Sequence, residues 1–269
     1  MEAKTIVITG ASDGIGKEAA KILKKHGHNV ILVGRNVRKT EEVAKSLSAD
    51  FFVSDYSKLS NVYTLANNLL SKLSNIDVLI NNAGGVSDIA SKTEDGFDEV
   101  IQVNYLAPFL LTQLLLPMLQ NDQASIINTA SEGHRLFGQL DLIDLYNGVT
   151  HTPEKSYGDS KIALILFSSE LQKRYGENGL PSMSFCPGVV HSNFASKSPS
   201  FRSMMSMFPS ISAQVGAKPL IHFAEGSPGV SWEKGAYYDR LTLTKPSKQV
   251  QNLQLQTDLW TLTELMLKL

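Results

Sequence analysis

A tyrosine and a lysine four positions apart, Tyr157 and Lys161, are the pair in this sequence best suited to proton transfer. They lie in residues 154–175, which have the pattern of a helix, and side chains at i and i+4 share one helix face. A free phenol has a pKa of about 10, too high for an efficient acid or base near neutral pH. A neighbouring ammonium stabilises the phenolate and is expected to lower that pKa. Because Tyr-x-x-x-Lys occurs often by chance, its meaning depends on the residues around it.

Two further polar residues are candidates for the same site. Ser131 follows a predicted strand, 125–129, at the edge where parallel sheets form their sites, so its hydroxyl is placed to polarise a substrate oxygen. The alternative for Ser131 is a helix or turn cap. Asn104 lies inside a predicted apolar helix, 98–120, where an amide is costly unless it is hydrogen-bonded. The alternative for Asn104 is a buried structural hydrogen-bonding role.

A glycine-rich turn, residues 9–16, separates the first predicted strand, 5–9, from a predicted helix, 15–26. Glycines allow a tight turn and a close approach of the backbone to a pyrophosphate, and the helix N-terminus offers free N–H groups. This context predicts a dinucleotide site, although an ordinary glycine turn is the alternative. The residues expected to contact the cofactor here are Gly10, Ser12, Asp13, Gly14, Ile15 and Gly16.

Strands and helices alternate along the whole chain with short connections, which indicates βαβ units. The expected strands are 5–9, 29–33, 50–53, 76–80, 125–129, 181–186 and 235–239. The expected helices are 15–26, 37–47, 58–73, 98–120, 154–175, 214–224 and a tail over 247–267. We therefore expect an α/β fold: one doubly wound Rossmann domain over residues 1–269, with a mostly parallel sheet of about seven strands and helices on both faces. Residues 192–210, rich in Ser, Met and Phe, are expected to form a mobile substrate loop with short helical pieces.

Composition limits the classes of function. The 269 residues carry a net charge of −1, so no overall field favours nucleic acid or an anionic membrane. The single cysteine, Cys186, excludes an intramolecular disulfide and suits a reducing compartment. We see no signal peptide and no stretch near 20 apolar residues, and we expect a cytoplasmic protein without a membrane span. His134, His151 and His191 lack metal-ligand spacing and are interpreted as loop histidines, with no metal site.

The spacing Gly-x-x-x-Gly-x-Gly, the run Asn81-Asn82-Ala83-Gly84 and the Tyr-x-x-x-Lys pair together resemble the short-chain dehydrogenase/reductase family. The resemblance implies a catalytic tetrad, in which an asparagine holds a water that relays protons to the lysine. It also implies that the turn after the fourth strand and the loop after the sixth strand contact a nicotinamide cofactor, with a serine in place of the usual threonine in that loop. The tetrad residues would be Asn104, Ser131, Tyr157 and Lys161, and the further cofactor contacts Asn82, Ala83, Gly84, Pro187, Gly188, Val190 and Ser192. Tyr157 and Lys161 are also expected to contact the cofactor, the lysine through the hydroxyls of the nicotinamide ribose.

The end of the second strand favours NADP(H) over NAD(H). NAD enzymes usually place a carboxylate there, whereas this chain has Gly34 followed by Arg35, whose guanidinium can pair with a 2′-phosphate. The alternative is a solvated surface charge. Arg38 is a further candidate, and Asp13 is less consistent because some NADP-preferring relatives have a basic residue there. Asp55 is expected near the adenine, with a helix N-cap as the alternative.

The gap of 26 positions between Ser131 and Tyr157 is longer than in most of the family. With Gly133-His134-Arg135 and the Leu259-Trp260 tail, it resembles the retinol-dehydrogenase and protochlorophyllide-reductase branch. That resemblance implies a small-molecule substrate, a lipophilic aldehyde, ketone or alcohol, and a possible homodimer or homotetramer. Apolar side chains that would form an adaptable lid, or else pack on the core or on a partner, are Phe201, Met204, Met205, Met207 and Phe208.

We therefore favour an oxidoreductase that transfers a hydride between NADP(H) and a carbonyl or alcohol, with Tyr157 as general acid/base. The alternative is a non-catalytic NADP-binding sensor or scaffold on the same fold. An isomerase or epimerase that uses bound cofactor transiently is a third hypothesis.

Overall fold

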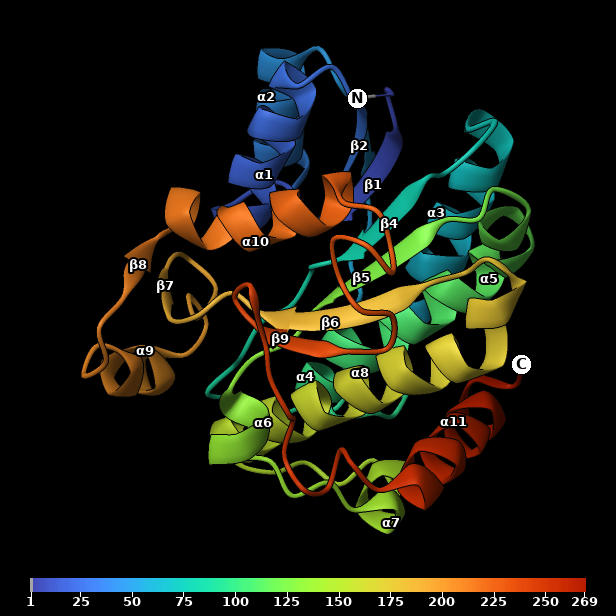
Figure 1. The fold of residues 1–269 in the computed structure, drawn as a ribbon. Coiled ribbons are helices and arrows are strands. Elements are labelled where there is room, and N and C mark those ends of the chain that lie inside the picture. Colours follow the sequence, from blue (N-terminus) through green and yellow to red (C-terminus); the bar gives the residue numbers. More distant parts are fainter. Residues whose placement is uncertain (1) are drawn as a thin grey trace.

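In the computed structural model, which describes residues 2–269, eight strands form one sheet with helices on both faces (Figure 1). Met1, part of the expected domain, lies outside the described residues. Every neighbouring pair of strands is parallel except the last, as expected for an α/β fold. Across the sheet the order is β3 (Asp50–Val53), β2 (Asn29–Gly34), β1 (Thr5–Thr9), β4 (Val78–Asn81), β5 (Ser125–Thr129), β6 (Ser182–Cys186), β9 (Tyr237–Asp239) and β10 (Thr242–Leu243).

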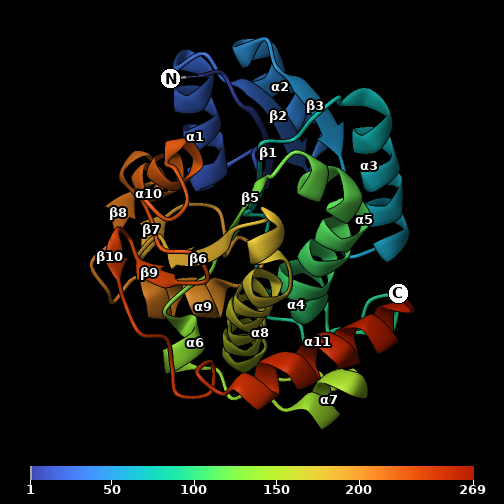
Figure 2. The same ribbon diagram turned by 45° about the vertical axis from the view of Figure 1, so that its right-hand side comes forward.

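The helices form two layers, which the two ribbon views show on opposite sides of the sheet (Figures 1 and 2). One layer holds α1 (Gly14–Lys25), α2 (Val37–Leu47) and α10 (Ala213–Glu225). The other holds α3 (Leu59–Lys72), α5 (Ala107–Asn121), α8 (Pro153–Tyr175) and α11 (Leu253–Leu267). The strands β1, β2 and β4 are almost wholly buried because both faces are covered, which accounts for their continuous apolar sequences.

Two expectations about the strands need correction. The sheet has eight strands instead of about seven, because β10 adds an antiparallel edge strand of two exposed residues that carries no hydrophobic pattern. The sequence also did not predict β7 (Val190–His191) and β8 (Ile211–Ser212), which flank the loop 192–210 and pair as a separate two-stranded sheet. The short helical structure expected inside that loop is present as α9 (Pro199–Met205). Such short elements are too brief to produce a periodic signal.

The expected long helix over 98–120 is interrupted. It begins as α4 (Glu99–Ile101), continues as a π-helical turn over Gln102–Leu106 and becomes α5. Asn104 lies in that π-helical turn, an irregularity that is frequent at functional sites. Contrary to our expectation, residues 99–121 have the length and mean hydropathy, 1.4, of a membrane-spanning helix. Their most apolar window is 72% buried inside the protein, as in a core helix.

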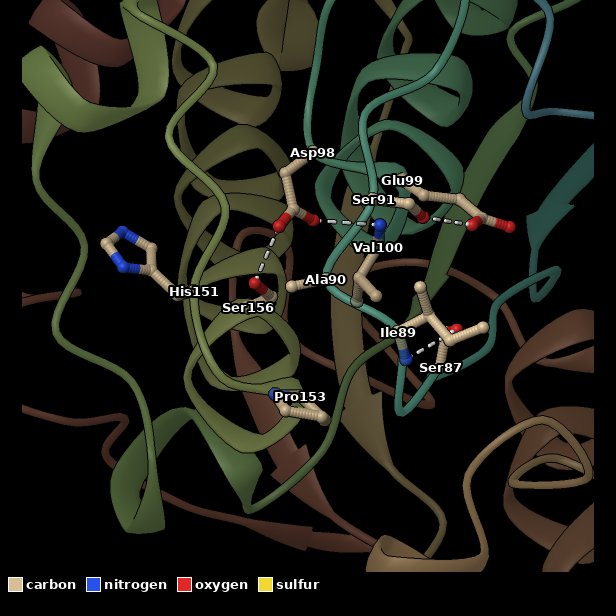
Figure 3. A pocket seen from close by; sticks show the side chains of 10 residues that line it. All are labelled: Ser87, Ile89, Ala90, Ser91, Asp98, Glu99, Val100, His151, Pro153 and Ser156. Carbon is tan, nitrogen blue, oxygen red and sulfur yellow. Dashed lines mark hydrogen bonds between the residues drawn. The ribbon is translucent and has the colours of Figure 1, made fainter.

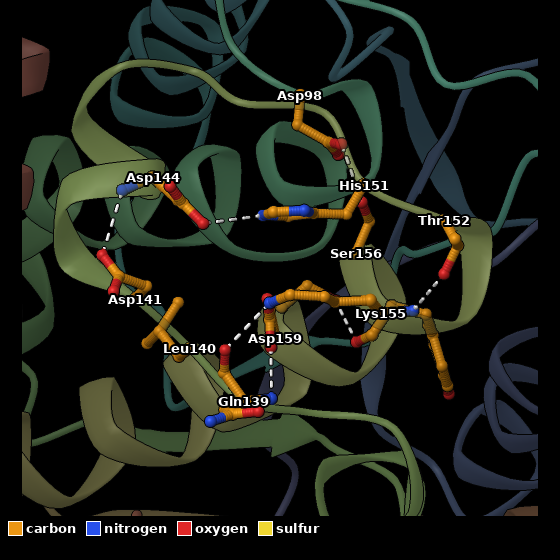
Figure 4. A network of polar contacts seen from close by, with 12 residues as sticks. Asp98, Gln139, Leu140, Asp141, Asp144, His151, Thr152, Lys155, Ser156 and Asp159 are labelled. Atoms are coloured by element: carbon orange, nitrogen blue, oxygen red, sulfur yellow. Dashed lines mark hydrogen bonds and ion pairs between the residues drawn. The ribbon is translucent and has the colours of Figure 1, made fainter.

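The insertion between Ser131 and Tyr157 folds against the first turns of α8. It contains α6 (Gly133–Leu136) and α7 (Leu142–Tyr146). Asp159 accepts from the Gln139 amide at 2.6 Å and pairs with Lys155 at 2.5 Å, while His151 pairs with Asp144 at 3.3 Å (Figure 4). A side chain at Gly158 would come within 2.3 Å of the Gly138 nitrogen. The residues between Tyr157 and Lys161 therefore anchor the insertion.

Candidate active site

The turns that carry most of the predicted site residues meet at the carboxyl edge of the sheet, because β1, β4, β5 and β6 are consecutive neighbours. The Thr9 hydroxyl, at the end of β1, accepts from the amides of Asn82 and Ala83 at 3.0 Å each. The Asn82 side chain donates back to the Thr9 carbonyl at 2.9 Å. These bonds join the glycine turn to the turn after β4. Thr9 is a site-forming residue that sequence reasoning missed, because only its partners reveal its role.

Tyr157 and Lys161 lie together on α8, and both are almost fully buried. The Lys161 ammonium lies 5.6 Å from the Tyr157 ring centroid and donates to the Thr129 carbonyl at 2.9 Å. Burial lowers the pKa of Lys161 to about 8, so this amine is mostly charged at neutral pH. Burial raises the pKa of Tyr157, and a hydrogen bond with Ser131 acts in the opposite sense. The expected lowering of the tyrosine pKa is therefore wrong, since desolvation outweighs the other contributions.

Ser131 lies beside the Tyr157 hydroxyl, and a glycine makes this approach possible. A side chain at Gly133 would meet the Tyr157 ring at 2.7 Å. The Ser131 Oγ accepts from the Gly133 amide at 3.0 Å. A hydroxyl has one proton to donate in addition to two acceptor lone pairs, so this bond leaves the proton of Ser131 available.

Asn104 makes contacts that hold the site together. Its Oδ1 accepts from the Gly85 amide at 2.8 Å, and its Nδ2 donates to the Gly85 carbonyl at 2.9 Å and to Ser160 Oγ at 3.1 Å. Both protons of the amide are therefore engaged in hydrogen bonds, as expected if Asn104 is a buried structural hydrogen-bonding residue. Asn104 connects the π-helical turn, the chain after β4 and α8 directly behind Tyr157.

The glycine turn has the shape that a dinucleotide requires. Gly10 has φ +68°, and a side chain there would meet the Ala83 backbone at 2.9 Å. A side chain at Gly16 would meet the Gly10 carbonyl at 2.5 Å. The chain therefore passes closely under the N-terminus of α1, between Ser12 and Ile15, where the Asp13 carboxylate accepts from the Gly14 amide. Such a close passage is what a pyrophosphate-binding turn requires.

Asp13 connects three parts of this region. It accepts from the Gly14 amide at 2.8 Å, from Lys39 Nζ at 3.1 Å and from Asn193 Nδ2 at 3.0 Å. Burial alone would raise the pKa of Asp13, but the bonds from Asn193, Lys39 and Gly14 lower it below its ordinary value. Lys39 of α2 thus supplies the positive charge that the glycine turn itself lacks.

At the end of β2, the structure leaves no room for a carboxylate on Gly34. A side chain at this position would come within 2.2 Å of Thr40 Oγ1 and 3.1 Å of the Ser12 side chain. Arg35 follows on the exposed side, and Arg38 is 83% exposed and 3.9 Å from Glu42.

Asp55, after β3, accepts from the amide and the hydroxyl of Ser57 at 3.1 and 2.9 Å. This local turn is similar to the helix N-cap expected as the alternative for Asp55. The N-cap position of α3 is nevertheless held by Lys58.

The loop after β6 closes over the glycine turn. Pro187 precedes Gly188, which has φ +86° and packs against Arg240. Val190 packs on Gly216 of α10. The Ser192 side chain lies 3.5 Å from the place that a side chain on Gly14 would take. Ser192 therefore lies at the glycine turn and accepts from the Phe194 amide at 3.3 Å.

Two phenylalanines cover the Tyr157 ring. Phe194 and Phe201 lie edge-on to it, with ring centroids at 5.4 and 5.2 Å. Phe201 is 3% exposed, and Met204 and Met205 pack beside it, whereas Met207 and Phe208 are 75% and 43% exposed. The expected lid therefore divides into an inner face against Tyr157 and an outer face toward solvent.

A small hollow beside α4 contains none of the predicted site residues (Figure 3). Its lining includes Asp98, whose carboxylate accepts from the Val100 amide at 2.9 Å and from the Ser156 hydroxyl at 2.8 Å. These bonds begin α4 and join it to α8, so the hollow is part of the structural support.

Comparison with known proteins agrees with this geometry. The sequence profile described as short chain dehydrogenase matches residues 4–202. The chain belongs to the short-chain dehydrogenase family. As a member it is an oxidoreductase of alcohol and carbonyl groups that uses a nicotinamide cofactor, and the resemblance to the retinol-dehydrogenase branch is confirmed.

The relatives of this short-chain dehydrogenase cover most of its length. Human Retinol dehydrogenase 11 is 35% identical over 267 residues, which cover 96% of this chain and 83% of that protein. Oxidoreductase calI from Penicillium decumbens is 36% identical over 203 residues, 70% of this chain and 58% of that protein. A solved short chain dehydrogenase from Escherichia coli CFT073, complexed with NADPH, has a TM-score of 0.68 and 26% identity, and covers 89% of this chain and 97% of that one.

Proposed function

We propose that this short-chain dehydrogenase is an NADP(H)-dependent oxidoreductase for lipophilic carbonyls and alcohols, with Tyr157 as the general acid/base. The observation that carries the proposal is the position of the Tyr157 hydroxyl beside Ser131 and on the same helix face as Lys161. A residue with this placement can exchange a proton with an oxygen whose carbon exchanges a hydride with the cofactor.

In the reducing direction, bound NADPH supplies a hydride to the carbonyl carbon. The Tyr157 phenol, whose pKa is about 10 when free and is raised further by burial, carries its proton at neutral pH and donates it to the carbonyl oxygen. The Ser131 hydroxyl, which already accepts from Gly133, donates to the same oxygen and polarises it. The Lys161 ammonium stabilises the phenolate that remains, until a proton from solvent restores the phenol. Asn104 positions the backbone behind Tyr157 through its bonds to Gly85 and Ser160.

NADP(H) preference is supported by the charges around the adenosine end of the expected cofactor position. The close approach of Thr40 excludes a carboxylate at Gly34, which would otherwise repel a 2′-phosphate. Arg35 is exposed beside it, and Lys39 neutralises Asp13. A guanidinium pairs with phosphate through two parallel hydrogen bonds.

Arg35→Ala is expected to raise the Kd for NADPH about 10- to 100-fold, because hydrogen bonds to charged groups contribute about 1.5–3 kcal/mol. The Kd for NADH should change little, since NADH has no 2′-phosphate. Fluorescence titration with both cofactors measures the difference. Lys45→Ala is the matched control, because Lys45 is an exposed cation of α2 that pairs with Glu41. Equal weakening of NADPH and NADH binding by Arg35→Ala would assign the phosphate to another residue.

The substrate class is supported by the inner face of the lid, where Phe194, Phe201 and two half-buried methionines surround Tyr157. In a series of straight-chain aldehydes, we expect kcat/KM to rise about fourfold for each added methylene until the pocket is filled, because burying one methylene contributes about 0.8 kcal/mol. NADPH absorbance measures the rates. A flat series would contradict an apolar pocket. NADPH binding without oxidation across short, long and aromatic carbonyls would instead favour the sensor or scaffold hypothesis.

A further inference from the structure

His134 is a buried residue close to the site for which the chemistry above has no role. It lies on α6, three residues after Ser131, and only 1% of it is exposed. The interpretation of His134 as a loop histidine is therefore wrong. A histidine with this burial must have hydrogen-bond partners, and those partners show what it holds in place.

Two hydrogen bonds fix the protonation state of its ring. The Ser247 amide donates to His134 Nε2 at 3.1 Å, so this nitrogen carries no proton. His134 Nδ1 lies 2.6 Å from the Ser131 carbonyl oxygen, which can only accept, so Nδ1 carries the proton and donates. His134 is consequently a neutral bridge between the backbone of Ser131 and the backbone of Ser247.

Burial of the ring favours this neutral form. Its ring lies edge-on to Tyr237 of β9 at 5.0 Å, and Tyr237 donates to the Glu132 carboxylate at 2.6 Å. Arg135 pairs with the same carboxylate at 3.0 Å. Burial lowers the pKa of His134 below its ordinary value, although the hydrogen bond to the Ser131 carbonyl and the charge of Glu132 act in the opposite sense. The charges near the ring are thus already paired with each other.

The segment before α11 completes the arrangement. Besides the Ser247 amide, the Lys245 carbonyl accepts from Arg135. The Gln249 side chain binds Leu140 in both directions, accepting from its amide at 3.0 Å and donating to its carbonyl at 2.6 Å. Residues 245–249 therefore hold both ends of the stretch from His134 to Leu140, although they lie more than 100 positions away from it in sequence.

We propose that His134 is a positioning residue for Ser131. Through it, the orientation of the serine hydroxyl depends on the position of residues 245–249. By holding the Ser131 carbonyl, His134 fixes the backbone from which Oγ reaches Tyr157. The inference rests on the proposed role of Ser131 in polarising the substrate oxygen. A small displacement of a reacting group costs a large factor in rate, about 100-fold for about 1 Å.

Two substitutions separate the two bonds of His134. The amide nitrogen of His134→Asn takes the place of Nδ1 and can still donate to the Ser131 carbonyl. The amide of His134→Gln takes the place of Nε2, so it can accept from Ser247 but does not reach the Ser131 carbonyl. Positioning predicts that His134→Gln lowers kcat by up to about 100-fold and that His134→Asn retains most of the activity, with the NADPH Kd unchanged in both. A packing role predicts the reverse order, because Gln is closer to His in size.

The decisive measurements are kcat, the KM for the aldehyde, and NADPH binding for both variants, with His222→Phe, an exposed histidine on α10, as control. Ser131→Ala is measured alone and combined with His134→Gln. Positioning predicts that His134→Gln lowers kcat in the wild-type background and not in Ser131→Ala, because residues that act as a unit are not additive. Equal losses in both backgrounds, or kcat for Gln at or above that for Asn, would overturn the inference. An inactive wild type, or full activity in Ser131→Ala, would instead refute the proposed function.

Discussion

Tyr157→Phe is expected to lower kcat about 100- to 10,000-fold, the range that general acid–base catalysis contributes. The substitution removes only the hydroxyl. The ring can keep its edge-on contacts with Phe194 and Phe201, so the lid and the glycine turn should remain in place. NADPH binding should therefore stay close to that of the wild type while turnover is lost. Steady-state NADPH absorbance and a fluorescence titration measure the two quantities separately.

The matched control is Tyr146→Phe, which removes the same hydroxyl from an exposed tyrosine of α7 and should leave kcat unchanged. Retained turnover in Tyr157→Phe would remove this tyrosine from the chemistry. Loss of NADPH binding together with turnover would mean that the hydroxyl acts mainly in holding the cofactor.

Trp260→Ala is expected to lower the free energy of unfolding by about 3–5 kcal/mol, the range for deleting a buried large aromatic side chain. Trp260 of α11 is 1% exposed, and its ring lies 4.9 Å from Phe109 of α5 and 5.9 Å from Phe167 of α8. The Arg174 guanidinium covers the ring at 4.7 Å. Removing the indole leaves a cavity where α11 closes the core over α5 and α8. Denaturant unfolding followed by circular dichroism gives the change.

Leu265→Ala serves as the comparison on the same helix, because Leu265 is 66% exposed and should contribute little. If Trp260→Ala lowered the free energy of unfolding by less than about 1 kcal/mol, α11 would contribute little to the stability of the core. Trp260→Phe should recover most of the stability, since the stacked contact with Phe167 requires a ring at this place.

The order of the short motifs along the sequence was enough to predict which segments of the candidate site lie near one another. Strands that alternate with helices form parallel sheets, and parallel strands present their carboxyl ends at one edge. For this reason the glycine turn, Asn82 and Ser131 could be assigned to one region from the sequence, and Tyr157 and Lys161 to one helix face. The apolar strands and the periodic helices gave the fold class, while the two-residue strands and the π-helical turn at Asn104 left no pattern to recognise.

The roles of single polar residues depended on partners far along the chain. The hydrogen-bond partner of Asn104 is Gly85, 19 positions away in sequence. Asp13 is bonded to Asn193, 180 positions away, and His134 to Ser247, 113 positions away. A hydrogen bond requires two groups within about 3 Å in a defined direction, and spacing in a sequence records neither distance nor direction beyond one element. The sequence thus predicted which residue types could do the chemistry, and the structure supplied their partners. Burial then shifted their pKa values, raising that of Tyr157 and lowering that of His134, because desolvation arises only when the surrounding elements have packed.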